Sequence, residues 1–193
     1  MQTAAPKILA FAGSTRTESF NKKLVSIAAS GARARGAEVT FLDLRDIPMP
    51  LYDGDLEIQQ GLSDNVKKFR VLLMEHDGLL ISAPEYNSGI SGVLKNAIDW
   101  ASRPLPGEAP LACFIGKVAL IMSASPGVLG GLRGLVQVRS ILSNIQVLVL
   151  SQQMAISKAD EAFNADGTLK DVKQQAAIEA LGRSLAEILI KLK

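Results

Sequence analysis

Hydrophobic residues gather in five short runs along the chain, and each run is followed by turn or loop residues. Apolar runs without clean alternation are typical of strands buried on both faces of a sheet. The predicted strands cover residues 7–12, 39–44, 79–83, 118–122 and 147–150. Between them, aliphatic residues recur at helical spacing, which predicts amphipathic helices.

The predicted helices alternate with the strands. They cover residues 21–36, 62–78, 89–101, 132–145 and 176–192, with Gly36 closing the first and Ser63 or Asp64 capping the second. Residues 46–55 are expected to form a surface loop, because Pro48 and Pro50 cannot continue a helix or a central strand. This alternation predicts an α/β fold, with a parallel sheet and helices on both faces.

Composition and charge leave the predicted fold unchanged and exclude several kinds of partner. With 193 residues the chain suits one core, and we expect a single domain over residues 1–193. The net charge is only +2 and no basic run stands out, so we expect no nucleic-acid partner. The sequence shows no leader-like N-terminus and no run of about 18 apolar residues, so we expect a cytoplasmic protein without a membrane partner.

Single copies of cysteine and histidine limit the chemistry further. Cys113 alone cannot form an internal disulfide, and His76 alone cannot supply a metal cluster or more than one member of a Ser-His-Asp triad. Cys113 lies in an apolar run and is expected to be a buried small hydrophobe. His76 is expected near a helix C-terminus. No metal site is expected.

A polar segment follows the first predicted strand. Residues 13–21 read Gly-Ser-Thr-Arg-Thr-Glu-Ser-Phe-Asn. Amides at a helix start attract anions, hydroxyls donate hydrogen bonds, and the Arg16 fork matches phosphate oxygens, so the segment predicts a phosphate site. It matches neither the Walker A pattern nor the dinucleotide fingerprint. The alternative is that Ser19 is only an N-cap and Arg16 only a solvated side chain.

A second segment, residues 82–89, follows the third predicted strand and reads Ser-Ala-Pro-Glu-Tyr-Asn-Ser-Gly. An isoalloxazine ring needs a flat neighbour and partners for its polar pyrimidine edge, which Tyr86, Asn87 and backbone groups can provide. The alternative is that Tyr86 is a partly buried loop aromatic and Glu85 a solvated carboxylate.

A third segment, residues 123–131, follows the fourth predicted strand and is rich in small residues. It suits either close backbone approach to a ring or a plain turn. Ligands of open parallel sheets bind beyond the carboxyl ends of the strands, where all three segments are expected to lie.

These segments, in this order, resemble the NADPH-dependent FMN reductase family, which includes chromate, quinone and azo-dye reductases of flavodoxin-like fold. Residues 13–21 resemble its Gly-Ser-x-Arg-x-x-Ser-x-Asn phosphate loop. Residues 84–87 followed by 94–100 resemble its flavin-ring signature, and residues 123–127 are similar as well. The resemblance implies a flavodoxin-like three-layer sandwich with five parallel strands in the order 2-1-3-4-5.

The resemblance also implies a cofactor and its contacts. FMN is expected without a covalent bond, with NADPH or NADH as electron donor. Phosphate contacts are implied for Ser14, Arg16, Ser19 and Asn21, and ring contacts for the second segment. The full set of implied cofactor-binding residues is Ser14, Arg16, Ser19, Phe20, Asn21, Pro84, Glu85, Tyr86, Asn87 and Ser123.

The implied reaction is a ping-pong cycle, in which a nicotinamide reduces the flavin and leaves before a small acceptor takes its place. Quinones, azo dyes, chromate and free flavin are the acceptors to consider. The flavin carries the chemistry, so no catalytic side chain is expected. The main alternative is a flavodoxin-type electron carrier with protein partners, although carriers are typically acidic and this chain has a pI near 8.7. A flavin-free signalling domain would need an acidic cluster after the first strand, where Gly13 and Ser14 stand.

Assembly is the last expectation. In the helix of residues 94–100, Ile98 and Trp100 fit packing or a subunit interface better than flavin contact, and we assign this helix mainly to assembly. The resemblance implies a homodimer or homotetramer. The segment after Gln152 supports little functional inference.

Overall fold

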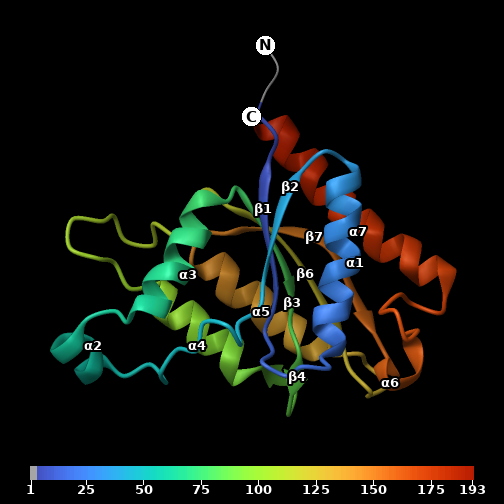
Figure 1. Cartoon of the computed structure of the whole chain (residues 1–193), viewed down its shortest axis with the longest axis horizontal. Helices are drawn as coiled ribbons and strands as arrows, with labels where there is room; N and C mark the ends of the chain where they lie inside the picture. Colours follow the sequence, from blue (N-terminus) through green and yellow to red (C-terminus); the bar gives the residue numbers. More distant parts are fainter. Residues whose placement is uncertain (1–3) are drawn as a thin grey trace.

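The computed structural model describes residues 4–193, and its centre is a five-stranded parallel sheet (Figure 1). The strands lie in the order β2-β1-β3-β6-β7, which confirms the predicted order once only the strands of this sheet are counted. Their bounds are β1 Lys7–Ala12, β2 Glu38–Leu42, β3 Gly78–Ser82, β6 Val118–Ala124 and β7 Leu148–Ile156.

Helices cover both faces of the sheet, as expected for buried parallel strands. Along β1, Ile8 and Ala10 belong to one apolar core, whereas Leu9 and Phe11 belong to the other, because successive side chains point to opposite faces. The first core lies under α1 Phe20–Ala34 and α7 Val172–Leu192. The second lies under α3 Asp64–Glu75, α4 Gly92–Ala101 and α5 Leu132–Asn144 (Figure 1).

Helices α1 and α7 pack against each other at two glycines. A Cβ atom on Gly182 would lie 1.8 Å from the carbonyl oxygen of Ala28, and one on Gly31 would lie 2.0 Å from that of Glu179. Only hydrogen atoms fit between the two backbones at these points. The pair therefore forms a tightly joined layer on this face of the sheet.

Several boundaries differ from the sequence prediction. Helix α4 begins at Gly92 and not at residue 89, because Ser91 is its N-cap and Gly89–Ile90 form β5, which pairs with β4 Glu85–Tyr86. Strand β7 continues to Ile156, well beyond the predicted end at residue 150. Two short helices were not predicted: α2 Gly54–Gln60, which Asp53 caps, and α6 Ala159–Ala162.

The interface alternative for the α4 helix is wrong for its two large side chains. Trp100 and Ile98 are buried within the chain, Trp100 against Leu62 and Val66. The indole Nε1 of Trp100 donates a hydrogen bond to the carbonyl oxygen of Pro50 at 2.8 Å. Helical periodicity alone does not tell an internal core contact from an intersubunit one.

The predictions for the single histidine and cysteine are confirmed. His76 is the C-cap residue of α3, and its ring contacts the carbonyl oxygen of Leu72 and the hydroxyl of Thr40. Cys113 is fully buried, and burial raises the pKa of its thiol. None of the helices in residues 4–193 is long and apolar enough to cross a membrane.

Candidate functional site

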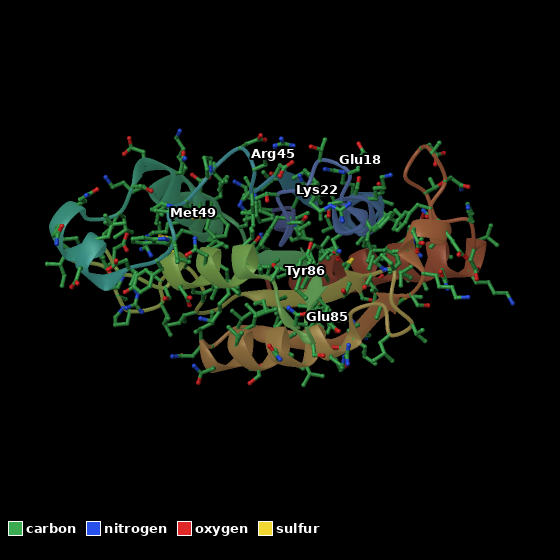
Figure 2. The ribbon with its side chains drawn as sticks, turned by 90° about the horizontal axis from the view of Figure 1, so that it is seen from below. Glu18, Lys22, Arg45, Met49, Glu85 and Tyr86 are labelled. Carbon is green, nitrogen blue, oxygen red and sulfur yellow. The ribbon has the colours of Figure 1, made fainter. Side chains whose placement is uncertain are left out.

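A cavity of about 260 Å³ lies at the carboxyl ends of β1, β3 and β6. Figure 2 views this end, with Tyr86 and Glu85 on the hairpin below Glu18 and Lys22 at the start of α1. All three segments singled out in the sequence contribute to its wall. The lining residues are Ser14, Arg16, Ser19, Phe20, Asn21, Pro84, Glu85, Tyr86, Ala124, Ser125 and Pro126.

The N-terminus of α1 opens onto this cavity without a cap. Among residues 4–193, the hydroxyl of the N-cap residue Ser19, a residue that is 4% exposed, makes no capping hydrogen bond, and the first turn carries no acidic side chain. Helices α2, α3 and α7, by contrast, are capped by the side chains of Asp53, Ser63 and Asp171. The first amides of α1 and the positive end of its dipole therefore remain available to an anion.

Arginine and serine side chains surround this open helix end. Arg16 is exposed, and its backbone N–H donates to the Oγ of Ser14 at 3.3 Å, which folds the loop back on itself. The Arg45 guanidinium donates to the Oγ1 of Thr17 from the loop after β2. Arg16 therefore lines the cavity, whereas Arg45 contacts the same loop through Thr17 and is not part of the wall.

Asn21 lines the cavity, but its amide is already used within the protein. Its Oδ1 accepts from the hydroxyl of Ser82 at 2.8 Å and from the N–H of Ala124 at 3.0 Å, and its Nδ2 donates to the carbonyl oxygen of Ala124 at 2.8 Å. Asn21 thus joins α1 to the ends of β3 and β6. Its side chain positions the loops around the cavity.

Gly13 lets α4 approach the end of β1. A Cβ atom there would lie 2.7 Å from the Cβ of Leu94, closer than real Cβ contacts allow. The hydroxyl of Ser91 donates to the carbonyl oxygen of Gly13 at 2.7 Å and accepts from the N–H of Leu94 at 3.2 Å, which caps α4. The first loop is therefore fixed against the helix that follows the second.

The second segment forms a hairpin with a two-residue turn. Asn87 and Ser88, between β4 and β5, have φ angles of 50° and 66°, as a type I′ turn requires at both central positions. Tyr86 is 56% exposed at the cavity mouth, whereas Pro84 is buried. The turn places an aromatic ring at the solvent side of the cavity. Asn87 lies at the exposed tip and does not line the cavity wall.

Glu85 connects this hairpin to the start of α5. Its carboxylate accepts from the N–H of Gly134 at 2.8 Å and from the Arg133 guanidinium at 2.9 Å. Burial alone would raise the pKa of Glu85, but these hydrogen bonds and the Arg133 charge outweigh it, so the pKa lies below the usual glutamate range. The carboxylate is therefore held ionised and serves as a distant cap for α5.

The third segment contributes Ala124, Ser125 and Pro126 to the wall, whereas Ser123 lies behind it. Ser123 is fully buried, and its Oγ finds no hydrogen-bond partner within residues 4–193. This oxygen lies 2.0 Å from where a Cβ on Gly131 would stand, and Gly131 has a φ of 95°. The N–H of Ser125 donates to the carbonyl oxygen of Ile156, so the far end of β7 supports this loop.

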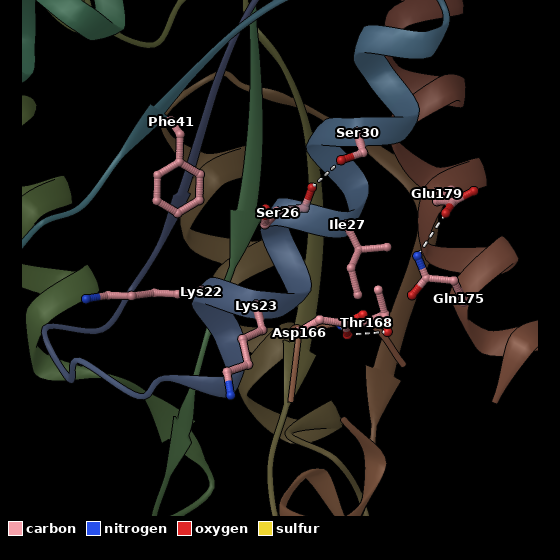
Figure 3. Close-up of a pocket in the computed structure, with 11 residues that line it drawn as sticks. Lys22, Lys23, Ser26, Ile27, Ser30, Phe41, Asp166, Thr168, Gln175 and Glu179 are labelled. Carbon is pink, nitrogen blue, oxygen red and sulfur yellow. Dashed lines mark hydrogen bonds between the residues drawn. The ribbon is translucent and has the colours of Figure 1, made fainter. Parts of the chain in front are cut away.

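A larger cavity of about 510 Å³ lies elsewhere, along the outer side of α1 (Figure 3). Its polar side chains pair with neighbours: Asp166 accepts from Thr168, and Gln175 donates to Glu179. These groups are satisfied by one another and do not converge on a common point. The smaller cavity, with its open helix end, is the better candidate site.

The sequence therefore singled out most of the cavity wall. Eight of the ten residues implied for the cofactor line it, while Asn87 and Ser123 lie beside it. Ala124, Ser125 and Pro126 were not named individually, although their loop was. Strand β6 extends to Ala124, so the part of this segment that lines the cavity begins one residue after Ser123.

Comparison with known proteins gives consistent matches. A family model described as NADPH-dependent FMN reductase matches residues 6–161. The chain is 38% identical over 174 residues to an NAD(P)H-dependent FMN reductase of Pseudomonas aeruginosa, covering 90% of this chain and 89% of that protein. It is 36% identical over 146 residues to a quinone reductase of Escherichia coli, covering 76% and 74%. A solved structure of a flavoenzyme NAD(P)H:(acceptor) oxidoreductase from Paracoccus denitrificans superimposes with a TM-score of 0.80 at 28% identity, covering 97% and 98%.

Proposed function

Because this chain belongs to the NADPH-dependent FMN reductase family and is therefore an FMN-containing, NAD(P)H-dependent oxidoreductase, we propose that the 260 Å³ cavity holds the flavin. The single observation that carries this placement is the uncapped N-terminus of α1 beside Arg16. An anion such as the FMN phosphate would satisfy that helix end, which the side chains of residues 4–193 leave uncapped.

The phosphate end is assigned as follows. Ser14 and Ser19 donate hydroxyl hydrogen bonds, Arg16 supplies a charged fork, and the backbone N–H groups of Phe20 and Asn21 complete the contacts. The Asn21 side chain positions these donors, because its amide is engaged with Ser82 and Ala124. Such preorganised donors require little reorganisation when the cofactor arrives.

The ring end is assigned to Pro84, Glu85 and Tyr86, which line the cavity together with residues 124–126, and to Asn87 at the hairpin tip beside the cavity. FMN, when bound, supplies electron transfer between a reduced nicotinamide and an acceptor. The protein holds the ring, and the exposed Tyr86 at the mouth leaves room for a second flat molecule. Glu85 is not assigned as a proton donor, because its carboxylate is held ionised by Gly134 and Arg133.

The open mouth favours a ping-pong cycle, in which donor and acceptor use one position in turn. Quinones, azo dyes, chromate and free flavin are the proposed acceptors, and either NADPH or NADH serves as donor. We also propose a cytoplasmic location, a single domain over residues 1–193 and a homodimer or homotetramer, with neither nucleic acid nor a membrane as partner.

The test begins with the visible spectrum of the purified protein. NADPH and then NADH are added without oxygen while the flavin absorbance is followed. We expect a yellow protein that either nucleotide bleaches rapidly. A yellow protein that ignores both nucleotides but takes electrons from a protein partner would support the carrier alternative. A colourless protein that cannot take up added FMN would refute the assignment of the cavity.

A further inference from the structure

Four basic side chains lie around the open end of α1, and two of them have no carboxylate partner. The four residues are Arg16, Lys22, Lys23 and Arg45. Lys22 and Lys23 form ion pairs with nearby carboxylates at 2.5 and 3.5 Å. Within the part of the chain that the structure describes, the two arginines form no ion pair. Both guanidinium groups are therefore free to bind an anion.

Arg45 is held in a fixed position by the loop that follows β1 and by its own loop. Its guanidinium donates to the Oγ1 of Thr17, and its backbone N–H donates to the Oδ1 of Asp43 at 2.9 Å. The other carboxylate oxygen of Asp43 accepts from the Nζ of Lys22. A guanidinium has several N–H donors in one plane, so most of them remain after the contact with Thr17.

The phosphate of FMN does not need Arg45. Arg16 lines the cavity wall, and together with the end of α1 it is already assigned to that phosphate. Arg45 is exposed outside the wall, at the same carboxyl end of the sheet. In Figure 2 it lies on the other side of Lys22 from Tyr86. Arg45 is therefore available to a second anion that binds outside the flavin cavity.

The electron donor can supply that anion. A reduced nicotinamide reaches the flavin through the mouth beside Tyr86, so the adenosine half of the donor must extend over the surface outside the cavity. NADPH carries a phosphate on the 2′-oxygen of its adenosine ribose, where NADH carries a hydroxyl. An arginine near this position is a common means of accepting the 2′-phosphate, because its planar fork matches phosphate oxygens.

Lys158 is a competing cation on the other side of the cavity. It is exposed in the segment after β7, which is hydrogen-bonded to the cavity wall at Ser125. The first turn of α6 follows it with two carboxylates that oppose its charge, and an ammonium lacks the planar fork. Arg45 also has an exposed acidic neighbour, Asp46, but Arg16 on the facing loop adds positive charge. The local charges therefore favour Arg45.

We propose that Arg45 binds the 2′-phosphate of NADPH and makes this protein prefer NADPH to NADH. Arg45 selects the donor and takes no part in electron transfer. NADH still reacts, because the flavin and the cavity mouth do not require the 2′-phosphate. The inference rests on the proposed function, since it assumes that a nicotinamide reduces a flavin held in the 260 Å³ cavity.

The first test compares the two donors in steady-state kinetics of the FMN-loaded protein. Wild type is expected to have a kcat/KM for NADPH about tenfold or more above that for NADH. Arg45→Gln should lower the value for NADPH by about tenfold or more and leave the value for NADH within about twofold, because a charge-assisted contact to phosphate is lost.

Two control variants accompany this comparison. Lys158→Gln removes the competing cation, and Arg183→Gln removes an arginine on α7 that pairs with Glu179. Both should keep the preference for NADPH. The proposal would be overturned by a wild type without preference, by an Arg45→Gln variant that affects both donors equally or neither, or by loss of the preference in Lys158→Gln.

A second test requires no turnover. Calorimetry measures the binding of adenosine 2′,5′-bisphosphate and of adenosine 5′-monophosphate to the FMN-loaded protein. We expect wild type to bind the bisphosphate more tightly by about tenfold or more, and Arg45→Gln to remove the difference. Equal binding of the two nucleotides by wild type, or a difference that survives in Arg45→Gln, would contradict the role of Arg45.

The visible spectrum of each sample separates this proposal from the proposed function. A yellow protein that nicotinamides bleach, but that does not distinguish NADPH from NADH, would refute the role of Arg45 and leave the flavin site intact. A protein that cannot take up FMN would refute the cavity assignment and this inference together.

Discussion

Helices α1 and α7 lie side by side on one face of the sheet, yet their N-termini are completed differently. Asp171 caps α7 by accepting from the N–H groups of Lys173 and Gln174 at 2.8 and 3.2 Å. Ser19 begins α1 without such a bond, and the turn that follows carries Lys22 and Lys23 and no carboxylate. The capped end contributes to folding, whereas the open end is the one that we propose for the phosphate. Stability and binding should therefore respond to different substitutions at the two ends.

The largest effect is expected where the two helices touch. Gly182→Ala should lower the free energy of unfolding by about 3 kcal/mol, because the added carbon meets the Ala28 carbonyl and the backbones must separate. Urea unfolding of the apoprotein measures this change. Gly92→Ala, where nothing lies within 4 Å of the added carbon, is the control and should change little. Equal stability of Gly182→Ala and wild type would show that the helices are less tightly joined than described.

The next effect concerns the open end of α1. Arg16→Ala should weaken FMN binding by about 30-fold, or about 2 kcal/mol, because a charge-assisted contact to phosphate is lost. Fluorescence titration of the apoprotein measures the affinity. The free energy of unfolding should change by less than about 0.5 kcal/mol, since Arg16 is exposed. Arg183→Ala removes the same charge from α7, and an equal loss of affinity there would remove the phosphate assignment.

A reciprocal pair of variants sharpens the comparison further. Asp171→Ala should cost about 1 kcal/mol of stability and leave FMN affinity unchanged, because a working cap is lost. Ser19→Ala should weaken FMN binding and leave the stability unchanged, because among residues 4–193 the Ser19 hydroxyl makes no capping hydrogen bond. Thermal unfolding measures the stability of both variants, and flavin titration measures their affinity for FMN. If Ser19→Ala destabilised the apoprotein as much as Asp171→Ala, the contrast between the two helix ends would be lost.

The smallest effect is expected at the start of α5, which is capped from a distance. The folded pKa of Glu85 lies below its unfolded value, so its contribution is present above the ordinary glutamate pKa of about 4.3 and is lost as pH falls through the folded pKa. Glu85→Gln should therefore cost about 0.5 kcal/mol at pH 7, and this difference should shrink below about pH 4. Unfolding at several pH values measures it, with the exposed Glu18→Gln as control. A difference that grew in acid would contradict the sign.

Much of this arrangement could be predicted from the sequence. Strand β1 matches its predicted bounds, because an apolar run followed by Gly13 leaves little freedom. The phosphate segment was found because hydroxyls and an arginine before a helix are chemically distinctive. Both signals are local, and the order of the strands follows from them together with the family resemblance.

Features that depend on distant contacts were not predicted. The second strand of the hairpin, Gly89–Ile90, was predicted as the start of a helix, because helical spacing extends back through Ile90, whereas the Ser91 cap begins α4 at Gly92. The far half of β7 contains serine and glutamines and lacks an apolar run, but its pairing with β6 orders it. The burial of Trp100 depends on the loop at Pro50, about fifty residues earlier in the chain, which no helical pattern reveals.

The buried amide of Asn21 has a consequence for engineering. Since one side chain holds the start of α1 to the ends of two strands, the length of the segment from Gly13 to Asn21 is set by geometry. Inserting a residue there would draw the amide away from both strands.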